Sequence, residues 1–261
     1  ALVLLDLRRI KQRRLFVSAA RAVARTRPVL AIRPGGRLDD PSGLADAAMD
    51  AAMRRAGILH AAGLEELLAA AETLARAKPR GEGDRVAILA NGIGLGRLAA
   101  DAALAHGLLL AETGGRNPLS LGSEAGAALP EEARRLAALP GVDTVIALHA
   151  PADEPAPGAQ LVAAGRGGRG APILFGWLGE GSALTERRFL TEAGLPVFST
   201  PEAAIRGAAH LAMERRNRAA AAELPPAEVL EVAPDRAKVR AILAAARADG
   251  RLRLFEDEAL A

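Results

Sequence analysis

The stretch that decides the fold class is residues 85–96, which read RVAILANGIGLG. The apolar run Arg85–Ala90 predicts a buried strand, and the glycine-rich segment Asn91–Gly96 predicts a tight turn. The residues that follow, 95–106, have the amphipathic pattern of a helix, and Gly107 is placed to end it. A strand, a short turn and a helix in this order are typical of a parallel sheet with helical crossovers.

The same alternation continues outward from this stretch in both directions. Further strands are expected at 2–7, 29–32, 58–61, 108–112, 143–149, 172–178 and 196–199. Further helices are expected at 12–25, 45–55, 64–77, 131–139, 159–164, 184–193, 200–218 and 235–248. Residues 34–42 and 113–129 are rich in turn residues and are expected to be irregular. The sequence therefore predicts an α/β protein with two parallel-sheet domains and a short helical C-terminal extension.

The predicted domain boundaries follow from composition. Residues 79–84 contain proline, glycine and charged residues but no apolar residue, which is typical of a linker. We therefore expect domains at 1–78 and 85–222, joined by this linker and followed by an extension at 223–261. The sequence begins inside a predicted strand and stops inside a further predicted helix at 256–261, so we expect a piece of a larger polypeptide.

Composition excludes several classes of protein. Half of the 261 residues are hydrophobic and a quarter are charged, which is typical of a globular protein. There is no cysteine, so disulfides, zinc–thiolate sites and cysteine nucleophiles are excluded. No apolar run reaches the roughly 20 residues needed to span a bilayer, and we expect a cytoplasmic protein with no membrane partner. A nucleic-acid partner is not expected either, because aromatics are only 2% and the basic cluster at 8–14 is better explained as a solvated helix start.

The glycine-rich turn Asn91–Gly96 is the first candidate site. Glycines let backbone N–H groups approach an anion closely, and the start of a helix favours negative charge. The turn is not a phosphate-binding Walker loop, because no Lys-Ser or Lys-Thr follows, and its alternate glycines do not fit GxGxxG. On spacing alone, an anion site and an ordinary tight turn stay equally open.

The other candidate chemistry is sparse. The four histidines, His60, His106, His149 and His210, do not have metal-ligand spacing, so no metal site is expected. His149 ends a strand and therefore faces the edge of a parallel sheet where ligands bind, whereas the other three favour packing or surface roles. No serine lies in a GxSxG elbow, which argues against a serine hydrolase.

The order of the pieces resembles the NDP-forming acyl-CoA synthetases, relatives of succinyl-CoA synthetase. The segments that carry the resemblance are LFVSAARAVARTRPVLAIRPGGR (15–37), RVAILANGIGLGRLAADAALAHGLLLAE (85–112), RRFLTEAGLPVFSTPEAAIRGAAHLAMERRN (187–217) and PDRAKVRAILAAARADGRLRLFEDEALA (234–261). The resemblance implies two flavodoxin-like, succinyl-CoA synthetase-like domains followed by the lead-in to an ATP-grasp domain. It also implies that the full-length protein has a CoA-binding domain and an ATP-grasp domain outside this chain.

The resemblance implies a chemistry as well. The family interconverts an acyl-CoA, phosphate and a nucleoside diphosphate with the free acid, CoA and the triphosphate, so CoA and ATP or ADP with Mg are implied for the full-length protein and no cofactor for this chain. The family's phosphocarrier histidine belongs in the segment 36–45, which here contains no histidine. Asp6 stands at the position of the family's orienting acid, and Ser120 replaces an acid of another motif. The glycine-rich turn, which in the family places a helix N-terminus against the phosphohistidine, is intact.

These observations give one hypothesis and two alternatives. The hypothesis is a non-catalytic, regulatory module that binds CoA, acyl-CoA or phosphate, within a GCN5-type protein lysine acetyltransferase. The alternatives are an active ADP-forming acetate or acyl-CoA ligase that works through an acyl phosphate, and an interaction scaffold. A homo-oligomer is a further expectation. The residues expected to bind the ligand are Asn91, Gly92, Ile93, Gly94, Leu95, Gly96, Asn117 and His149.

Overall fold

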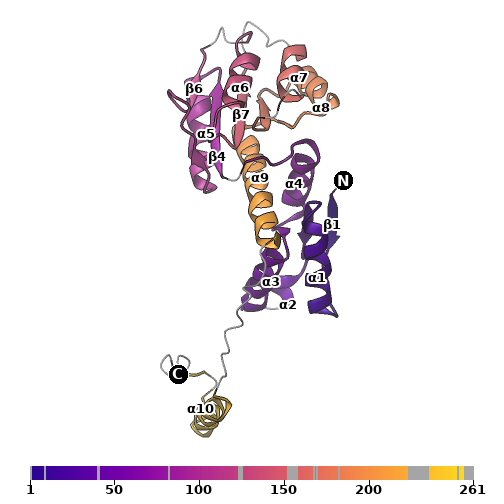
Figure 1. Ribbon diagram of the computed structural model, residues 1–261, viewed down its shortest axis with the longest axis vertical. Coiled ribbons are helices and arrows are strands. Elements are labelled where there is room, and N and C mark those ends of the chain that lie inside the picture. The colour runs from indigo at the N-terminus through magenta and orange to yellow at the C-terminus, as the bar shows by residue number, and fades with distance from the viewer. Residues whose placement is uncertain are drawn as a thin grey trace. The chain divides into compact units, whose positions relative to one another are not determined.

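The computed structural model describes residues 2–8, 10–39, 42–81, 83–122, 126–151, 158–166, 168, 170–181, 183–222, 235–251 and 253–255 (Figure 1). Residues 1–223 form one compact unit and residues 224–261 a second. Every paired strand in the described residues runs parallel to its neighbour. The α/β class with parallel sheets, predicted from the strand–helix alternation, is therefore confirmed.

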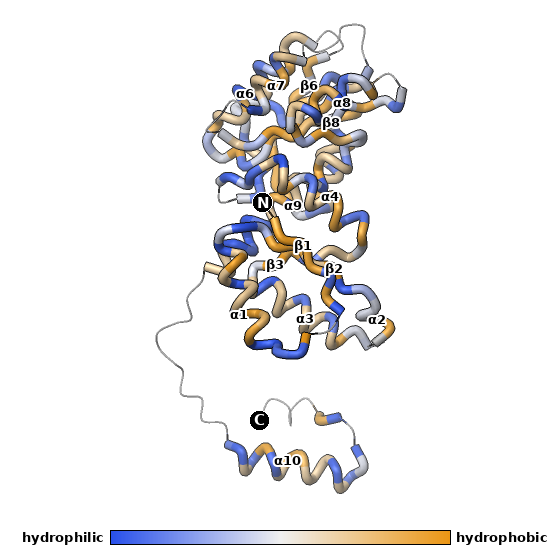
Figure 2. The backbone as a smooth tube through the Cα atoms, turned by 90° about the vertical axis from the view of Figure 1, so that its right-hand side faces the viewer, coloured by the Kyte–Doolittle hydropathy of each residue, from blue (hydrophilic) through white to orange (hydrophobic). Residues whose placement is uncertain are grey.

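The first lobe, residues 2–76, is built on a three-stranded sheet of order β1-β2-β3. Its elements are β1 (Val3–Asp6), α1 (Arg13–Ala24), β2 (Val29–Ile32), α2 (Gly36–Asp39), α3 (Leu44–Arg55), β3 (Ile58–Ala61) and α4 (Leu64–Arg76). Helix α4 packs on one face of the sheet, and helices α1 and α3 pack on the other. Apolar residues concentrate in β1, which is orange in Figure 2.

The second lobe, residues 85–200, contains a six-stranded sheet of order β5-β4-β7-β8-β9, with β6 also paired to β4. Its strands are β4 (Arg85–Ala90), β5 (Leu109–Leu110), β6 (Leu119–Ser120), β7 (Thr144–His149), β8 (Ile173–Trp177) and β9 (Val197–Phe198). Its helices are α5 (Ile93–Ala105), α6 (Leu129–Ala137), α7 (Gly158–Arg166) and α8 (Leu184–Glu192). Strands β7 and β8 are buried along their whole length, as expected for central strands of a sheet that helices cover on both faces.

Helix α9 (Pro201–Ala222), orange in Figure 1, contacts elements of both lobes. Its residues Ile205 and Leu211 join α4 of the first lobe and α5 of the second in one continuous apolar cluster. Near its other end, Ala221 packs with Ala24 and Met53 in the core of the first lobe. The opposite face of the second sheet has a separate core, formed with α6, α7 and α8.

Local sequence signals explain most helix ends. Gly57, Gly107 and Gly250 follow α3, α5 and α10 and adopt the positive φ angles that end helices. Helix α10 (Arg236–Ala248) lies in the second compact unit, where Asp235 Oδ1 accepts hydrogen bonds from the backbone N–H groups of Ala237 and Lys238. Asp235 is thus a side-chain cap of the kind that begins many helices.

Several details differ from the sequence prediction. The segment 113–129, predicted to be irregular, contains the strand β6 and the first residue of α6, which begins two residues before the predicted start at 131. The segment 34–42, predicted to be irregular, contains the short helix α2. Helix α5 begins at Ile93, two residues before the predicted start, so only Asn91 and Gly92 form the turn. The glycines hid this start because glycine disfavours a helix interior, whereas the first turn tolerates it. The helix predicted at 256–261 lies outside the described residues.

Candidate functional site

The N-terminus of α5 follows directly from the carboxyl end of β4. Gly92 is the N-cap residue, in an extended conformation, and its carbonyl accepts the hydrogen bond of the Gly96 N–H at 3.1 Å. Within the described residues, no side chain caps this end, and the first turn contains no acidic residue. Its first N–H groups therefore carry an uncompensated partial positive charge.

The space in front of this helix end is open on one side and closed on the other. A Cβ atom added to Gly94 would meet no atom within 4 Å, and Ile93 is exposed. A Cβ added to Gly96 would lie 2.9 Å from Cβ of Pro118. Gly94 therefore leaves room for a ligand at the helix N-terminus, whereas Gly96 lets α5 pack closely on the sheet edge.

Asn91 ties the ends of two strands together. Its Nδ2 donates a hydrogen bond to the carbonyl of Ala150 at 2.9 Å, and its Oδ1 accepts one from the Ala150 N–H at 2.9 Å. The backbone N–H of Asn91 also donates to the carbonyl of Leu148. This buried amide thereby fixes the end of β4, and with it the start of α5, against the end of β7.

Asn117 completes the edge of the second sheet. Its Oδ1 accepts from the Ile88 N–H, and its Nδ2 donates to the carbonyls of Val86 and Ala111, each at 2.9 Å. The amide fills the gap on β4 between the register of β5 and that of β6. All of these contacts are with backbone groups, so the ligand-binding role predicted for Asn117 stays a prediction.

His149 is the last residue of β7 and is only 5% exposed. Its ring stacks on that of Trp177, the residue beside it on β8, with centroids 4.4 Å apart and planes inclined by 10°. Burial lowers the pKa of His149, and the nearby Glu186 carboxylate opposes this shift only in part. The imidazole is therefore neutral at pH 7, and its Nε2 has no hydrogen-bond partner among the described residues.

The carboxyl edge of the first sheet has more exposed polar groups than that of the second. Asp6 ends β1, is half exposed and forms an ion pair with Arg8 at 3.1 Å. In the histidine-free segment 36–45, Gly43 adopts a φ of 70° as the N-cap residue of α3, and Ser42 Oγ accepts a hydrogen bond from the Leu44 N–H. Residues 40 and 41 lie outside the described residues.

A cavity of about 890 Å³ opens beside this segment. Its polar lining includes Arg33, Asp46, Asp50, His60 and Glu66. Nδ1 of His60 lies 2.8 Å from Oδ1 of Asp50, so this nitrogen is the donor to the carboxylate and Nε2 lies outside the pair. The sequence analysis assigned His60 to packing or the surface, because nothing in one sequence pairs β3 with the acidic residues of α3.

The carboxyl edges of the two sheets do not meet at the N-terminus of α5. A second cavity, of about 560 Å³, is lined by His60 and Glu66 of the first lobe and by His106, which directly follows α5. Helix α5 has 13 residues and a length of about 20 Å, so its N-terminus lies far from this cavity. The part of α5 that meets the first lobe at this cavity is therefore its C-terminal end.

Two features of the described residues bear on the class of ligand or partner. In the part of the chain that the structure describes, no cluster of three or more histidine and acidic side chains has the arrangement of a metal site. Nor does any described helix combine the length and apolarity required to cross a bilayer.

Comparison with known proteins agrees with this architecture. The sequence profile of the family described as "Succinyl-CoA ligase like flavodoxin domain" matches residues 1–74, which comprise nearly the whole first lobe. The flavodoxin-like character expected of the first lobe is therefore confirmed.

Solved structures match across both lobes. The dinucleotide-forming acetyl-coenzyme A synthetase 1 of Ca. Korarchaeum cryptofilum has a TM-score of 0.73 in its apo form and 0.74 in complex with phosphate and ADP. Its identity to this chain is 21%, over 85% of this chain and 54% of that one. A protein from Pyrococcus horikoshii has a TM-score of 0.68 and 23% identity over 81% of this chain and 52% of that one. The chain thus spans about half the length of these proteins and shares their fold.

Proposed function

We propose that this chain is a ligand-binding module of the acyl-CoA synthetase type, which binds inorganic phosphate, or a phosphate group of CoA or acyl-CoA, at the N-terminus of α5. The observation that carries the proposal is the uncapped, acid-free start of α5, held in place by Asn91 and open in front of Gly94. A phosphate there would accept hydrogen bonds from backbone N–H groups and compensate the helix dipole.

The proposed role is regulatory and not catalytic. The segment 36–45 lacks the histidine that would carry a phosphoryl group in the family that the sequence resembles. Asp39, Asp40 and Ser42 cannot take its place, because none of them offers an imidazole that accepts and releases phosphate at neutral pH. The acetyltransferase context considered from the sequence has no support in the matches above, so the protein that this module regulates stays open.

Calorimetric titration of the full chain with inorganic phosphate and with acetyl-CoA tests the proposal. The informative variant is Gly94→Asp, which puts a carboxylate in the first turn of α5. An acid at this position stabilises a helix by about 0.3–1 kcal/mol but repels an anion from the same N–H groups. We therefore expect a folded variant whose Kd for phosphate is at least about tenfold higher than that of the wild type.

The matched control is Gly94→Ala, whose added Cβ meets open space and should leave the Kd within about twofold. Equal phosphate affinity in wild type and Gly94→Asp would refute the proposed site. If phosphate, CoA, acetyl-CoA and ADP all fail to bind the wild-type chain, an interaction scaffold becomes the better explanation.

A second candidate function is an active acyl-CoA ligase that uses a different histidine. The observation in its favour is the His60–Asp50 pair, which lies in the cavity beside the segment 36–45 and engages only Nδ1 of His60. Because no described residue of α5 lines this cavity, the N-terminus of a phosphate-binding helix would have to come from a second copy of the chain or from a domain outside it.

The two functions differ in a direct chemical test. An active ligase should form ATP from acetyl-CoA, phosphate and ADP in the full-length protein, and radiolabelled phosphate should attach in a form stable to base and labile to acid. The His60→Asn variant should abolish this label if His60 is the carrier. Robust turnover with a label that depends on His60 would favour the ligase and overturn the regulatory module.

A further inference from the structure

A third cavity, of about 690 Å³, lies at the amino edge of the second sheet. It is surrounded by the start of β8 and by the C-terminal ends of α4, α6, α7 and α8. Five of its lining residues are cations from four separate segments: Arg76, Lys78, Arg80, Arg134 and Arg166. None of the described lining residues is acidic. The cavity is thus strongly positive although the whole chain has a net charge of only +3.

Three of the guanidinium groups are oriented by neutral backbone carbonyls. Nη1 of Arg80 donates to the carbonyl of Gly168 at 2.6 Å, and Nη1 of Arg76 donates to that of Thr191 at 2.7 Å. Nε of Arg166 donates to the carbonyl of Ala193 at 3.0 Å. A carbonyl fixes a guanidinium without cancelling its charge, and each guanidinium has five N–H donors. Donors and charge therefore remain for a ligand.

Capping of helix ends accounts for only part of this charge. Thr191 and Ala193 lie at the C-terminal end of α8, where arginines offset the negative end of the helix dipole. Arg76 also lies 3.3 Å from the exposed carboxylate of Glu72. The side chains of Lys78 and Arg134, by contrast, have no hydrogen bond or ion pair to any other described residue. The cavity therefore holds more positive charge than its helix ends require.

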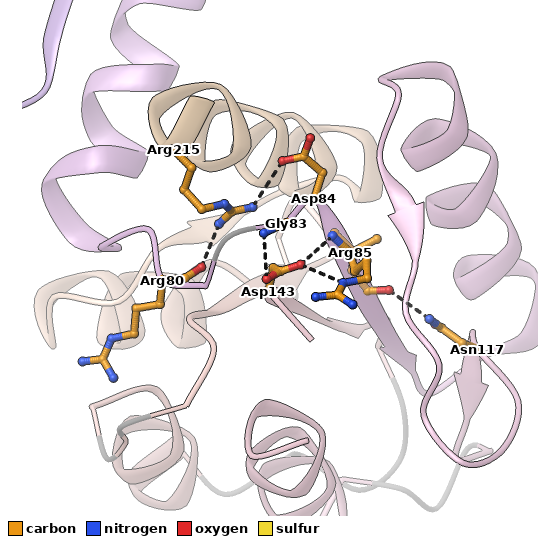
Figure 3. A network of polar contacts seen from close by, with 8 residues as sticks. Arg80, Gly83, Asp84, Arg85, Asn117, Asp143 and Arg215 are labelled. Carbon is orange, nitrogen blue, oxygen red and sulfur yellow. Dashed lines mark hydrogen bonds and ion pairs between the residues drawn. The ribbon is translucent and has the colours of Figure 1, made fainter. Parts of the chain in front are cut away.

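The segment after α4 that supplies Lys78 and Arg80 is held in place by hydrogen bonds with Asp143 and Arg215. Asp143 accepts hydrogen bonds from the backbone N–H groups of Gly83 and Arg85 at 3.2 and 3.0 Å, and Arg215 donates to the carbonyl of Arg80 at 3.3 Å. Figure 3 shows the side chain of Arg80 pointing away from this network. The network therefore positions the linker while leaving the guanidinium of Arg80 to face the cavity.

We propose that this cavity binds a small molecule with a multiply charged phosphate group, either free pyrophosphate or the diphosphate of a nucleotide. Arginine forks match phosphate oxygens in pairs, and several converging cations favour a ligand that carries two or more negative charges. The volume lies within the range of about 300–1,000 Å³ typical of small-molecule sites. Most of the other residues that line the cavity are alanine, glycine and proline, whose small side chains leave room for a ligand between the cations.

The test is calorimetric titration of the full chain with pyrophosphate, ADP and inorganic phosphate. The informative variant is Lys78→Glu with Arg134→Glu, because neither side chain has a partner among the described residues whose loss would unfold the protein. We expect saturable 1:1 binding of pyrophosphate that weakens with salt, and a Kd at least about tenfold higher in the double variant. The control is Arg55→Glu, an exposed charge reversal outside the cavity, which should leave the Kd unchanged.

The relative affinities for ADP and pyrophosphate, and the variant that loses binding, decide between the possible ligands and sites. Tighter binding of ADP than of pyrophosphate identifies a nucleotide as the source of the phosphates, and equal binding identifies the diphosphate group itself. Failure of both probes to bind overturns the proposal. So does pyrophosphate binding that survives in the double variant and is lost in Gly94→Asp, because the probe would then occupy the N-terminus of α5.

Discussion

The two lobes share a parallel α/β plan but hold their polar groups in opposite ways. In the first lobe, polar side chains at the carboxyl edge pair with one another, as in Arg33–Asp46 and His60–Asp50, and stay partly exposed. In the second lobe, Asn91, Asn117 and Asp143 are directed at backbone groups of the strands and the linker. The first lobe therefore leaves polar side chains accessible to a ligand, whereas the second uses them for its own architecture.

This difference explains why a phosphate site in the second lobe would be formed by backbone N–H groups and not by side chains. With the asparagine amides engaged, the first N–H groups of α5 remain without side-chain partners at its carboxyl edge. The comparison also predicts where substitutions destabilise the protein. Loss of a polar side chain should cost much more stability in the second lobe than in the first.

The largest effect is expected for Asp143→Ala. Asp143 is 3% exposed, and without its carboxylate the N–H groups of Gly83 and Arg85 lose their acceptor. We expect the free energy of unfolding to fall by about 3–4 kcal/mol, measured by urea denaturation. The control is Asp101→Ala, an exposed acid on α5 that should change stability by less than about 0.5 kcal/mol. Similar losses in both variants would contradict the comparison.

The same residue has a defined pH response. Burial alone would raise the pKa of Asp143, but hydrogen bonds from Arg85 and Gly83 hold this pKa below its ordinary value of 3.8. Its contribution to stability is therefore present above the unfolded-state pKa and is lost only as the pH falls through the lower folded-state pKa.

The next largest effect is expected for Asn117→Ala, which removes the partners of the Ile88 N–H and of the Ala111 carbonyl, whereas the Val86 carbonyl keeps its hydrogen bond from the Ala111 N–H. We expect a loss of about 2–3 kcal/mol in the free energy of unfolding, again by urea denaturation. Asn117→Asp keeps the acceptor for the Ile88 N–H and loses both donors, so its stability should be no higher than that of the wild type. Wild-type stability in the alanine variant would show that water replaces the amide.

A smaller, pH-dependent effect is expected at His149. Because burial lowers the folded-state pKa of His149, the unfolded chain takes up a proton first as the pH falls below about 6.5. Stability should then decrease by up to about 1.4 kcal/mol per pH unit until the folded-state pKa is reached. His149→Phe retains an aromatic ring beside Trp177 and should lack this slope in denaturation curves between pH 7 and 5. Parallel pH profiles for the two proteins would exclude His149 as the source.

The smallest effect is expected in the first lobe, for Glu66→Gln. Glu66 Oε2 accepts a hydrogen bond from the Ala62 N–H at 2.7 Å, and its Oε1 lies 3.9 Å from Nε2 of His210. Interaction with His210 is the main cause that lowers the pKa of Glu66. Glutamine keeps an acceptor for Ala62, so we expect a loss of only about 0.5–1 kcal/mol. A loss as large as that of Asp143→Ala would break the proposed contrast between the lobes.

The framework of the fold is accessible from sequence because its signals are local. The strands β2, β3 and β4 have the predicted bounds, since each is a short apolar run between turn residues. Gly57 and Gly107 end helices as predicted, because only a residue without a side chain takes a positive φ freely. These features depend on neighbours within a few positions.

The candidate sites depend on partners that are distant in sequence. The amide of Asn91 contacts Ala150, and nothing in the sequence around either residue predicts this contact. The basic cavity at the amino edge collects side chains from residues 76 to 166, and His60 gains its significance from Asp50 on a neighbouring helix. The start of α5 could therefore be predicted from the sequence as a candidate site. The sequence had no signal for the basic cavity or for the cavity that contains His60 and Asp50.

The packing of α9 determines when the first lobe can complete its core during synthesis of the chain. Gly57 in the first lobe sits so close to the last turn of α9 that an added Cβ would lie 2.9 Å from Cβ of Ala221. Arg21 on α1 and Arg25, which directly follows that helix, both donate hydrogen bonds to the carbonyl of Ala221. On the ribosome, the first lobe therefore has all its strands long before it has the helix end that closes its core. Its completion waits for α9, which follows the second lobe in the sequence, so the two lobes mature together although they are synthesised one after the other.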